Sequence, residues 1–337
     1  MNEINVIYQF NEKYVPYAGV SITSLLLNNA KAHEVNVYIL GENLSVKSIE
    51  RLSETAGRLG GKIWFVRTEQ LLSEFEEMGM IPYRGAYSVY LRLFFTRLID
   101  MKGKRVVYLD ADTIIDRDIY DLAYHDLNGK SIGMVLESIT DDYKLMIGMS
   151  KESEYYNSGM IVYDVDRWCE KDYCAKLLEH IRNVRSSYIG DQDFINIVCA
   201  GDICRLPLKY NFQPLHARYT EKQYFSAFGQ EPYYSAEEIE KNREEAAIYH
   251  CYRWLGEFPW NRGNLHPFND IFDRYMQMSD WKGYVKEKAD KGPALYIEKM
   301  LYVLPRGIFI KIFRKAHEIV LMRAEADARQ SRANLQA

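Results

Sequence analysis

Hydrophobic residues in the first part of the chain alternate between short runs and longer stretches with helical spacing. Residues 4–10, 35–40 and 62–66 are short apolar runs that are typical of buried strands. Between them, residues 15–28 and 45–59 carry apolar side chains at the three- and four-residue spacing of a helix. This order of strand, helix, strand, helix and strand predicts a parallel sheet that is covered by helices on both faces.

The remainder of the chain continues the alternation with less regular spacing. We predict further strands at 105–109, 131–136, 160–164, 203–206 and 246–251, helices at 71–79, 87–98 and 165–186, a loop at 190–194 that opens a helix through Val198, and an aromatic loop at 209–219. The expected architecture is an α/β fold with a Rossmann-like, mostly parallel sheet that is flanked by helices.

Two aspartates follow the predicted strand at 105–109. In doubly wound sheets, ligands bind at the carboxyl ends of the strands, which is where Asp110 and Asp112 emerge. The side chains of residues i and i+2 of an extended chain point the same way, so both carboxylates could coordinate one hard divalent cation. Asp-x-Asp is also common in solvated acidic turns, but its place after a hydrophobic strand in mid-chain favours a metal site.

Two further residues are candidates for site chemistry. His250 ends the last predicted strand, where a third metal ligand would emerge, although a single strand histidine is usually structural. Arg92 lies among apolar neighbours, so it either extends to the surface or faces an anion in a cleft. The chain has no G-x-G-x-x-G after its first strand, so a bound nucleotide would need a metal rather than a glycine turn to neutralise its phosphates.

The composition narrows the class of protein. The chain has 337 residues and a formal net charge of −4, so nothing in its overall charge indicates nucleic acid binding. Its 27 tyrosines suit a sugar-binding surface, although cores and interfaces use tyrosine too. The five cysteines are odd in number and contain no C-x-x-C pair, which favours reduced thiols in a cytoplasmic protein. We see neither a signal peptide nor an apolar run of about 20 residues.

The ordered motifs of the chain resemble retaining glycosyltransferase family 8, which contains bacterial lipooligosaccharide galactosyltransferases and the glycogenins. The matching segments, in chain order, are Tyr14, Tyr90–Leu93, Tyr108–Asp112, Tyr156–Gly159, Asp191–Asp193, Ile248–His250 and Pro259–Trp260. The resemblance covers residues 4 to 262, and the shared order is far more specific than Asp-x-Asp alone. It implies a fold of the GT-A type.

The resemblance also implies a ligand set and a donor site. Asp110, Asp112 and His250 would hold Mn²⁺ or Mg²⁺ against the donor diphosphate, and an imidazole suits Mn²⁺ better than Mg²⁺. The implied donor-binding residues are Tyr8, Asn11, Tyr14, Arg92, Asp110, Ala111, Asp112, Asn157, Ser158, Asp191 and Gln192. Among these, Tyr14 would stack on uracil, while Asn11 and the backbone near Tyr8 would meet the edge of the base.

Gln192, Asp191 and Arg92 are the implied catalytic residues. Gln192 would lie beside the anomeric carbon, opposite the leaving UDP, and Arg92 would contact the phosphate and sugar. An amide is a poor nucleophile, which favours attack on the same face guided by the leaving phosphate, although Asp191 or Glu137 stays open as a nucleophile. One residue departs from the family pattern, because Phe258 stands where a lysine usually contacts the diphosphate. Arg253 or Arg262 is a candidate to supply the missing charge.

The C-terminal part of the chain differs from the rest. We expect a catalytic domain at 1–264 and a helical region at 265–337. The stretch 301–323 carries one predicted apolar face, composed of Ile308, Phe309, Ile312, Phe313, Ala316, Ile319 and Val320. Lys311, Arg314 and Lys315 lie beside this face, which favours either peripheral contact with the inner face of the cell membrane or packing on the protein or a second subunit.

The resemblance therefore predicts a metal-dependent retaining glycosyltransferase. It would move a hexose, glucose or galactose, from a UDP-sugar to a glycan, lipid-linked or envelope glycan acceptor. One alternative is a non-catalytic module that binds sugar nucleotides or glycans, which only the absent lysine favours. Another is a phosphatase of the haloacid dehalogenase type, but its Asp-x-Asp normally lies near the N-terminus and is followed by Thr or Val where this chain has Ile114.

Overall fold

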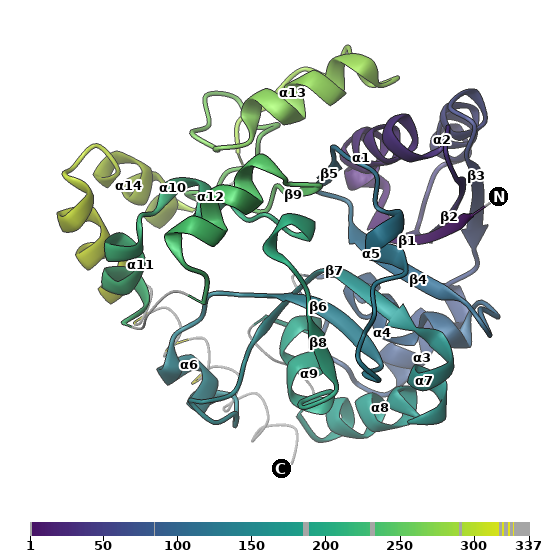
Figure 1. Ribbon diagram of the computed structural model, residues 1–337, viewed down its shortest axis with the longest axis horizontal. Coiled ribbons are helices and arrows are strands. Elements are labelled where there is room, and N and C mark those ends of the chain that lie inside the picture. Colours follow the sequence, from purple (N-terminus) through teal and green to yellow (C-terminus); the bar gives the residue numbers. More distant parts are fainter. Residues whose placement is uncertain are drawn as a thin grey trace.

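A seven-stranded sheet with the strand order β3-β2-β1-β4-β7-β6-β8 forms the centre of the protein (Figure 1). The computed structural model describes residues 2–83, 85–184, 189–229, 233–289 and 292–316, together with 319, 323 and 326. The strands are β1 (Glu3–Asn11), β2 (Glu34–Glu42), β3 (Lys62–Val66), β4 (Arg105–Asp110), β6 (Ile132–Leu136), β7 (Tyr156–Asp164) and β8 (Ile203–Arg205). Strands β1 to β4 are mutually parallel where they pair, β7 is antiparallel to both of its neighbours, and β8 is parallel to β6. The predicted mixed, mostly parallel sheet is confirmed.

Helices cover both faces of this sheet (Figure 1). On one face lie α1 (Val15–Asn29), α2 (Val46–Arg58) and α13 (Asn269–Met278), and on the other lie α3 (Glu69–Glu77), α4 (Leu91–Phe94), α7 (Val165–Glu170), α8 (Tyr173–Val184) and α9 (Asp191–Val198). The side chain of Ser45 accepts a hydrogen bond from the Ser48 backbone N–H, so it caps α2. Short helices complete the fold: α5 (Tyr120–Ala123), α6 (Asp141–Met146), α10 (Pro214–Arg218), α11 (Glu221–Phe228), α12 (Ala236–Glu244) and α14 (Pro293–Leu301).

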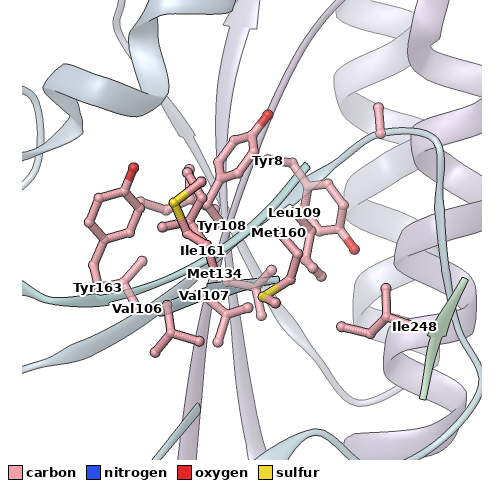
Figure 2. Packing of buried hydrophobic residues seen from close by; sticks show 14 of the residues in the cluster. Tyr8, Val106, Val107, Tyr108, Leu109, Met134, Met160, Ile161, Tyr163 and Ile248 are labelled. Atoms are coloured by element: carbon pink, nitrogen blue, oxygen red, sulfur yellow. The ribbon is translucent and has the colours of Figure 1, made fainter. Parts of the chain in front are cut away.

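The buried faces of β1, β4, β6 and β7 meet in one hydrophobic core (Figure 2). Tyr8, Val107 and Tyr163 are completely buried there. The central strands are buried along nearly their whole length, as expected for a sheet that is covered on both faces. Phe272 of α13 and Trp281 belong to the same core, so residues beyond 264 also pack against the sheet domain.

The predicted helix at 87–98 is wrong. Three short turns replace it, at Ser88–Tyr90, Leu91–Phe94 and Phe95–Arg97, of which only the middle one is α-helical. Every residue from 91 to 95 is buried, including Arg92, and a regular helix on a sheet surface buries only one of its faces. The broken backbone therefore directs these side chains to different parts of the core and the site.

Other boundaries differ from the prediction for local reasons. The predicted helix at 165–186 is divided into α7 and α8 near Asp172, which has a φ of 49°. The predicted strand at 160–164 begins earlier, at Tyr156, so the Tyr156–Gly159 motif lies inside β7. Residues 185–186 lie outside the described part of the chain.

A separate two-stranded antiparallel sheet brings the end of the catalytic region back to the Asp-x-Asp turn. It is formed by β5 (Thr113–Ile115) and β9 (Ile248–His250), with Thr113 paired to His250. The predicted strand at 246–251 is therefore shorter than expected and lies outside the seven-stranded sheet. This pairing is what places His250 next to Asp112.

Helix α14 lies at the end of the molecule opposite β3 (Figure 1). Residues 306–316 are helical and follow α14. Phe309 and Ile310 are buried in a small cluster with Trp254, whereas Ile308 and Ile312 are exposed. The single apolar face predicted for 301–323 is therefore divided, and Val320 lies outside the described residues. None of the described helices is long and apolar enough to cross a membrane.

Candidate active site

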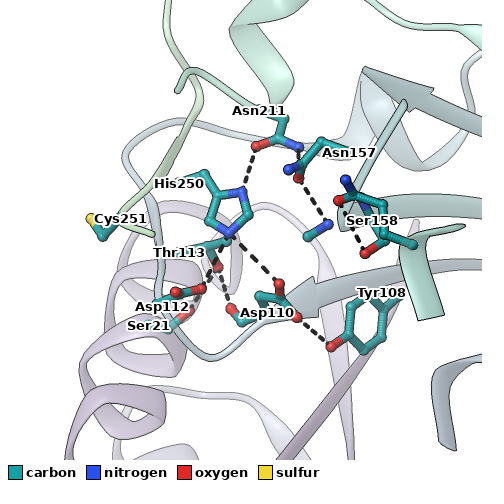
Figure 3. A network of polar contacts seen from close by, with 12 residues as sticks. Ser21, Tyr108, Asp110, Asp112, Thr113, Asn157, Ser158, Asn211, His250 and Cys251 are labelled. Atoms are coloured by element: carbon teal, nitrogen blue, oxygen red, sulfur yellow. Dashed lines mark hydrogen bonds and ion pairs between the residues drawn. The ribbon is translucent and has the colours of Figure 1, made fainter. Parts of the chain in front are cut away.

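Three potential metal ligands converge at the carboxyl end of β4. Ligand atoms of Asp110, Asp112 and His250 all lie within 4.8 Å of one another. The Nε2 atom of His250 is 3.3 Å from Asp112 Oδ1 and 3.6 Å from Asp110 Oδ2 (Figure 3). Burial acts to lower the pKa of His250, but the two carboxylates outweigh it and hold that pKa above its ordinary value.

The donor set of this cluster fits a divalent ion. Two carboxylates and one imidazole are ligand types that Mn²⁺ and Mg²⁺ accept, and the imidazole favours Mn²⁺. His250 presents Nε2 to the carboxylates, while its Nδ1 lies 3.0 Å from Asn211 Oδ1. A ligating histidine is commonly held through its second ring nitrogen in this way.

Gly159 makes room for the imidazole. A Cβ on Gly159 would lie 2.0 Å from His250 Cε1, far inside van der Waals contact. The glycine lies in the middle of β7, where it would otherwise weaken the strand. Its presence there is explained by the close approach of the His250 ring.

Arg92 connects the aspartate cluster to the first turn of α9. Its guanidinium pairs with Asp110 Oδ1 at 2.9 Å and with Asp191 Oδ2 at 3.2 Å. It also donates to the Ser158 carbonyl at 2.9 Å, and its Cζ lies 4.2 Å above the Tyr108 ring. Arg92 is 6% exposed, so it does not extend to the surface. Of the two alternatives for this residue, extension to the surface is wrong, and the structure shows Arg92 paired with the protein's own carboxylates.

Burial raises the pKa of Asp191 to about 6, against the opposing effect of the Arg92 guanidinium. Asp191 lies in the first turn of α9, directly after Gly190, whose φ of 61° allows the sharp entry into the helix. The carboxyl is thus close to the arginine but poorly solvated. Its ionisation depends on that arginine more than on water.

Gln192 is fixed by hydrogen bonds at both ends of its amide. Its Oε1 accepts from the Ser158 backbone N–H at 2.9 Å, and its Nε2 donates to the Tyr155 hydroxyl at 3.2 Å. The Tyr155 hydroxyl in turn donates a hydrogen bond to the Asp193 carboxylate at 2.6 Å, and the same carboxylate accepts one from the Tyr143 hydroxyl at 2.7 Å. The third residue of the Asp191–Asp193 motif is completely buried and supports Gln192 through Tyr155.

The predicted nucleotide residues lie at the carboxyl end of β1, beside the cluster in the sheet. Tyr8 is completely buried and bonded to Ser21 at 3.0 Å, so only its backbone is available near a base. The Oδ1 atom of Asn11 is shielded from solvent and has no hydrogen-bond partner in the described part of the chain. Tyr14 is half-buried and lies edge-on to Trp260, with ring centroids 6.4 Å apart.

Phe258, at the place of the family lysine, belongs to an aromatic stack. Its ring stacks on Trp260 at 4.3 Å, and Trp260 stacks on Tyr17 at 3.9 Å. The Cζ atom of Arg253 lies 5.2 Å from the Phe258 ring centroid, which is within the range of a cation–π contact. Of the two arginines that could replace the lysine, Arg253 is therefore the one that lies against this stack.

Asn157 has both of its amide atoms engaged. Its Oδ1 accepts from Asn211 Nδ2 at 2.8 Å and from the Gly159 N–H at 2.9 Å, and its Nδ2 donates to Glu137 at 2.5 Å. Ala111 is buried between the two aspartates. The structure thus brings together the predicted residues from β4, β7, α9 and β9. Asn11 and Tyr14 lie beside them, at and just after the carboxyl end of β1.

Sequence reasoning missed Asn211, Tyr155 and Asp193 as members of this network. Asn211 lies in a segment that looks like an aromatic loop, and nothing in its spacing indicates that it reaches His250. Tyr155 precedes the Tyr156–Gly159 motif, and its proximity to that motif is the one available signal. Glu137 is a candidate nucleophile by sequence, yet in the structure it accepts a hydrogen bond from Asn157.

The sequence profile of glycosyl transferase family 8 matches residues 5–272, which is most of the chain. General stress protein A of Bacillus subtilis is 24% identical over 274 residues, covering 80% of this chain and 92% of that protein. Lipopolysaccharide 1,2-glucosyltransferase of Escherichia coli is 24% identical over 286 residues, covering 83% and 79% of the two chains.

Among solved structures, the galactosyltransferase LgtC in complex with donor and acceptor sugar analogs has a similar fold, with a TM-score of 0.65. It is 20% identical, and the match covers 83% of this chain and 99% of that one. The sheet order, the flanking helices and this likeness identify the GT-A fold.

Proposed function

The chain belongs to glycosyl transferase family 8, and on that premise we propose that it transfers a hexose, glucose or galactose, from a UDP-sugar to a glycan acceptor with retention of configuration. The observation that carries the proposal is the convergence of Asp110, Asp112 and His250 within 4.8 Å. Arg92 joins this cluster to Asp191 at the start of α9. One end of the site can therefore hold the diphosphate while the other end holds the sugar.

The diphosphate is proposed to bind at the aspartate–histidine cluster. Asp110, Asp112 and His250 would hold Mn²⁺ or Mg²⁺, which supplies positive charge to the departing diphosphate. Arg92 supplies a second, permanent positive charge within the protein. Because it is buried and already oriented by two carboxylates, it stabilises developing negative charge without having to reorganise.

Retention of configuration is inferred from the residue that the family resemblance places beside the anomeric carbon. A retaining glycosidase places a carboxylate nucleophile beside the anomeric carbon. Here the candidate residue is Gln192, whose amide is held by Ser158 and Tyr155 and is a poor nucleophile. We propose that Gln192 supports positive charge on the sugar while the acceptor attacks the face that the diphosphate leaves. Asp191 and Glu137 remain the alternative nucleophiles.

The base is proposed to bind at the carboxyl end of β1. Asn11 Oδ1 is an acceptor without a partner among the described residues, which suits the N3–H donor of uracil. Tyr14 offers a ring face for stacking. Arg253, held beside Phe258 by a cation–π contact, is the proposed substitute for the family lysine at the diphosphate.

The acceptor is proposed to be a lipid-linked or envelope glycan, reached from the inner face of the membrane. The support is an exposed apolar surface on α14 and the turn that follows it, where Ile297, Met300 and Val303 are 56%, 72% and 87% exposed. Exposed Lys311 and Lys315 lie on the next helical segment. Exposed apolar side chains followed along the chain by basic residues suit a surface of anionic lipid.

The experiment that tests this function is a screen of nucleotide sugars for Mn²⁺-dependent hydrolysis, followed by glycan acceptors with the active donor. We expect UDP-glucose or UDP-galactose to be hydrolysed slowly and transferred faster once an acceptor is present. The anomeric configuration of the product, measured by NMR, should match that of the donor. A protein that binds UDP-sugars but hydrolyses none of them would be a non-catalytic binding module instead.

A further inference from the structure

We infer that Asn211 is a positioning residue, which holds the His250 ring so that Nε2 faces Asp110 and Asp112. It does so as the middle member of a hydrogen-bonded chain that runs from His250 through Asn211 and Asn157 to Glu137. The inference rests on the proposed metal site, because orienting Nε2 matters only if that nitrogen binds an ion.

The donors and acceptors along this chain have one consistent direction, and Figure 3 shows its members His250, Asn211 and Asn157. His250 Nδ1 lies 3.0 Å from Asn211 Oδ1, and Asn211 Nδ2 donates to Asn157 Oδ1 at 2.8 Å. Asn157 Nδ2 donates to the Glu137 carboxylate at 2.5 Å. The Gly159 N–H also donates to Asn157 Oδ1, which fixes which end of that amide is the oxygen.

That direction determines which atom of Asn211 faces the imidazole. Because the Asn211 nitrogen is used by Asn157, the atom that meets His250 Nδ1 is an oxygen, which can only accept. Nδ1 must then carry a proton. In a neutral imidazole the other nitrogen, Nε2, is left with a lone pair, and this is the nitrogen that lies beside the two aspartates.

The backbone holds Asn211 at this place. Phe212, the next residue, donates from its N–H to the Ile248 carbonyl at 2.8 Å and accepts from the His250 N–H at 3.0 Å. The segment thus runs parallel to β9, with an isolated bridge between Phe212 and Tyr249. Asn211 and His250 are carried by adjacent, hydrogen-bonded stretches of chain, so their side chains keep their relative position.

The first three residues of this hydrogen-bonded chain are buried, which makes the acceptor at Asn211 important for the orientation of the His250 ring. Asn211 is completely buried, and His250 and Asn157 are 3% and 5% exposed, so water cannot readily replace a lost acceptor. Gly159 contacts one side of the ring, and the Tyr252 ring lies edge-on at 5.0 Å. These contacts restrict the position of the imidazole, while Asn211 is the polar group that distinguishes its two nitrogens.

The test measures Mn²⁺ binding directly, by the loss of the free-ion EPR signal on adding the full-length, metal-stripped protein. Asn211→Leu removes the acceptor at similar size, and we expect a roughly 10- to 100-fold weaker affinity, as for other partners of ligating histidines. Asn211→Asp keeps an oxygen for Nδ1 but loses the donor to Asn157 Oδ1, so its affinity should lie between that of Asn211→Leu and that of the wild type.

Two further variants make the outcome specific. Asn29 is another completely buried asparagine, whose amide bonds to backbone groups of α1 and of residue 119, away from the site. Asn29→Leu controls for the general cost of removing a buried amide, and it should bind Mn²⁺ like the wild type. Asp112→Asn should abolish the binding that the wild type shows.

The results separate the two hypotheses. If Asp112→Asn abolishes binding but Asn211→Leu binds as tightly as the wild type, the inference on Asn211 is wrong while the metal site stands. Equal losses in Asn211→Leu and Asn211→Asp would also overturn it, because a role in packing rather than as an acceptor would be indicated. If Asp112→Asn leaves wild-type binding unchanged, the proposed metal site itself is wrong, and the role of Asn211 falls with it.

Discussion

Gly159 and His250 are in such close contact that no side chain larger than hydrogen fits at position 159, since a Cβ there would lie 2.0 Å from His250 Cε1. This contact lies between the middle of β7 and the end of β9, two strands that belong to different sheets. It explains a glycine inside a buried strand by what lies against it. The same contact sets how closely the imidazole can approach Asp110 and Asp112.

Gly159→Ala should therefore impair the metal cluster. Neither the β7 backbone nor the buried ring can move freely, so we expect His250 to be displaced and transfer to fall about 10- to 100-fold. The measurement is the Mn²⁺ dependence of donor hydrolysis, compared with that of Gly57→Ala. Gly57 lies in α2, and a methyl group added there would have no atom within 4 Å, so that variant should keep full activity and gain about 0.5–1 kcal/mol of stability. Wild-type metal dependence in Gly159→Ala would contradict this account of the glycine.

Removing the metal should abolish transfer. The chain has no glycine-rich phosphate loop, so the diphosphate depends on the ion and on Arg92. We expect excess EDTA to stop the reaction and Mn²⁺ to restore it. Asp112→Asn should be inactive with an unchanged melting temperature, because the Asp112 carboxylate forms an ion pair only with His250 within the described part of the chain. Asp110→Asn is a less clear test, since Asp110 also bonds to Arg92 and Tyr108. Full activity in EDTA would reject metal dependence.

Gln192→Ala should lower turnover more than donor affinity. If the amide stabilises positive charge on the sugar, its contact strengthens in the transition state, and kcat falls while KM for the donor changes little. The matched variant is Tyr155→Phe, which leaves Gln192 in place but removes the hydroxyl that its Nε2 contacts. It should show a smaller loss of kcat in the same direction. Unchanged turnover in Gln192→Ala would remove this residue from the reaction.

The raised pKa of Asp191 predicts that activity falls at acidic pH. Its pKa is raised to about 6, so the ion pair with Arg92 is lost as the pH falls through that value. We expect kcat/KM to decrease below pH about 6, and Asp191→Asn to lack this inflection.

The effect of Asp191 on stability has the opposite sign. A carboxyl whose pKa is raised on folding binds its proton more tightly in the native state. Its contribution to the free energy of unfolding therefore falls as the pH rises from about 4 to about 6. Loss of activity on acidification without loss of stability from this group would distinguish the two effects, and a flat pH profile would contradict the assignment.

The sequence predicted the first half of the fold well because its signals are local. Strands β1 to β3 and helices α1 and α2 have clear hydrophobic periodicity, and the Ser45 cap marks where α2 begins. The position of Asp110 and Asp112 at the end of β4 follows from the same reasoning. The turns around Arg92 were not predicted, because a largely apolar run looks helical although tertiary packing breaks it.

What the sequence could not supply is the set of contacts between distant segments. Three-residue strands such as β5 and β9 have no periodicity that names their partner, so the pairing of Thr113 with His250 was invisible. Asn211 gives no signal at all, since an asparagine in a loop is ordinary. The family resemblance selected His250 correctly as a neighbour of the aspartates, but it carried no information on the residues that hold its ring.

The exposed apolar surface of α14 gives the last prediction, that this part of the protein binds anionic membranes. Met300 of α14 and Val303 of the turn after it are 72% and 87% exposed, and replacing both with glutamate should abolish sedimentation with anionic liposomes while the melting temperature stays the same. Each nearby basic residue contributes about 1 kcal/mol at low salt, so wild-type binding should weaken as salt is added.

Deleting residues from 301 onward is a poor test, because it also removes Phe309, which is buried against the cluster that contains Trp254. Phe309→Ala is the matched control: it should lower the free energy of unfolding by about 3–5 kcal/mol and leave liposome binding of the folded protein intact. If the wild type fails to sediment with anionic liposomes at both low and high salt, this surface does not bind membranes.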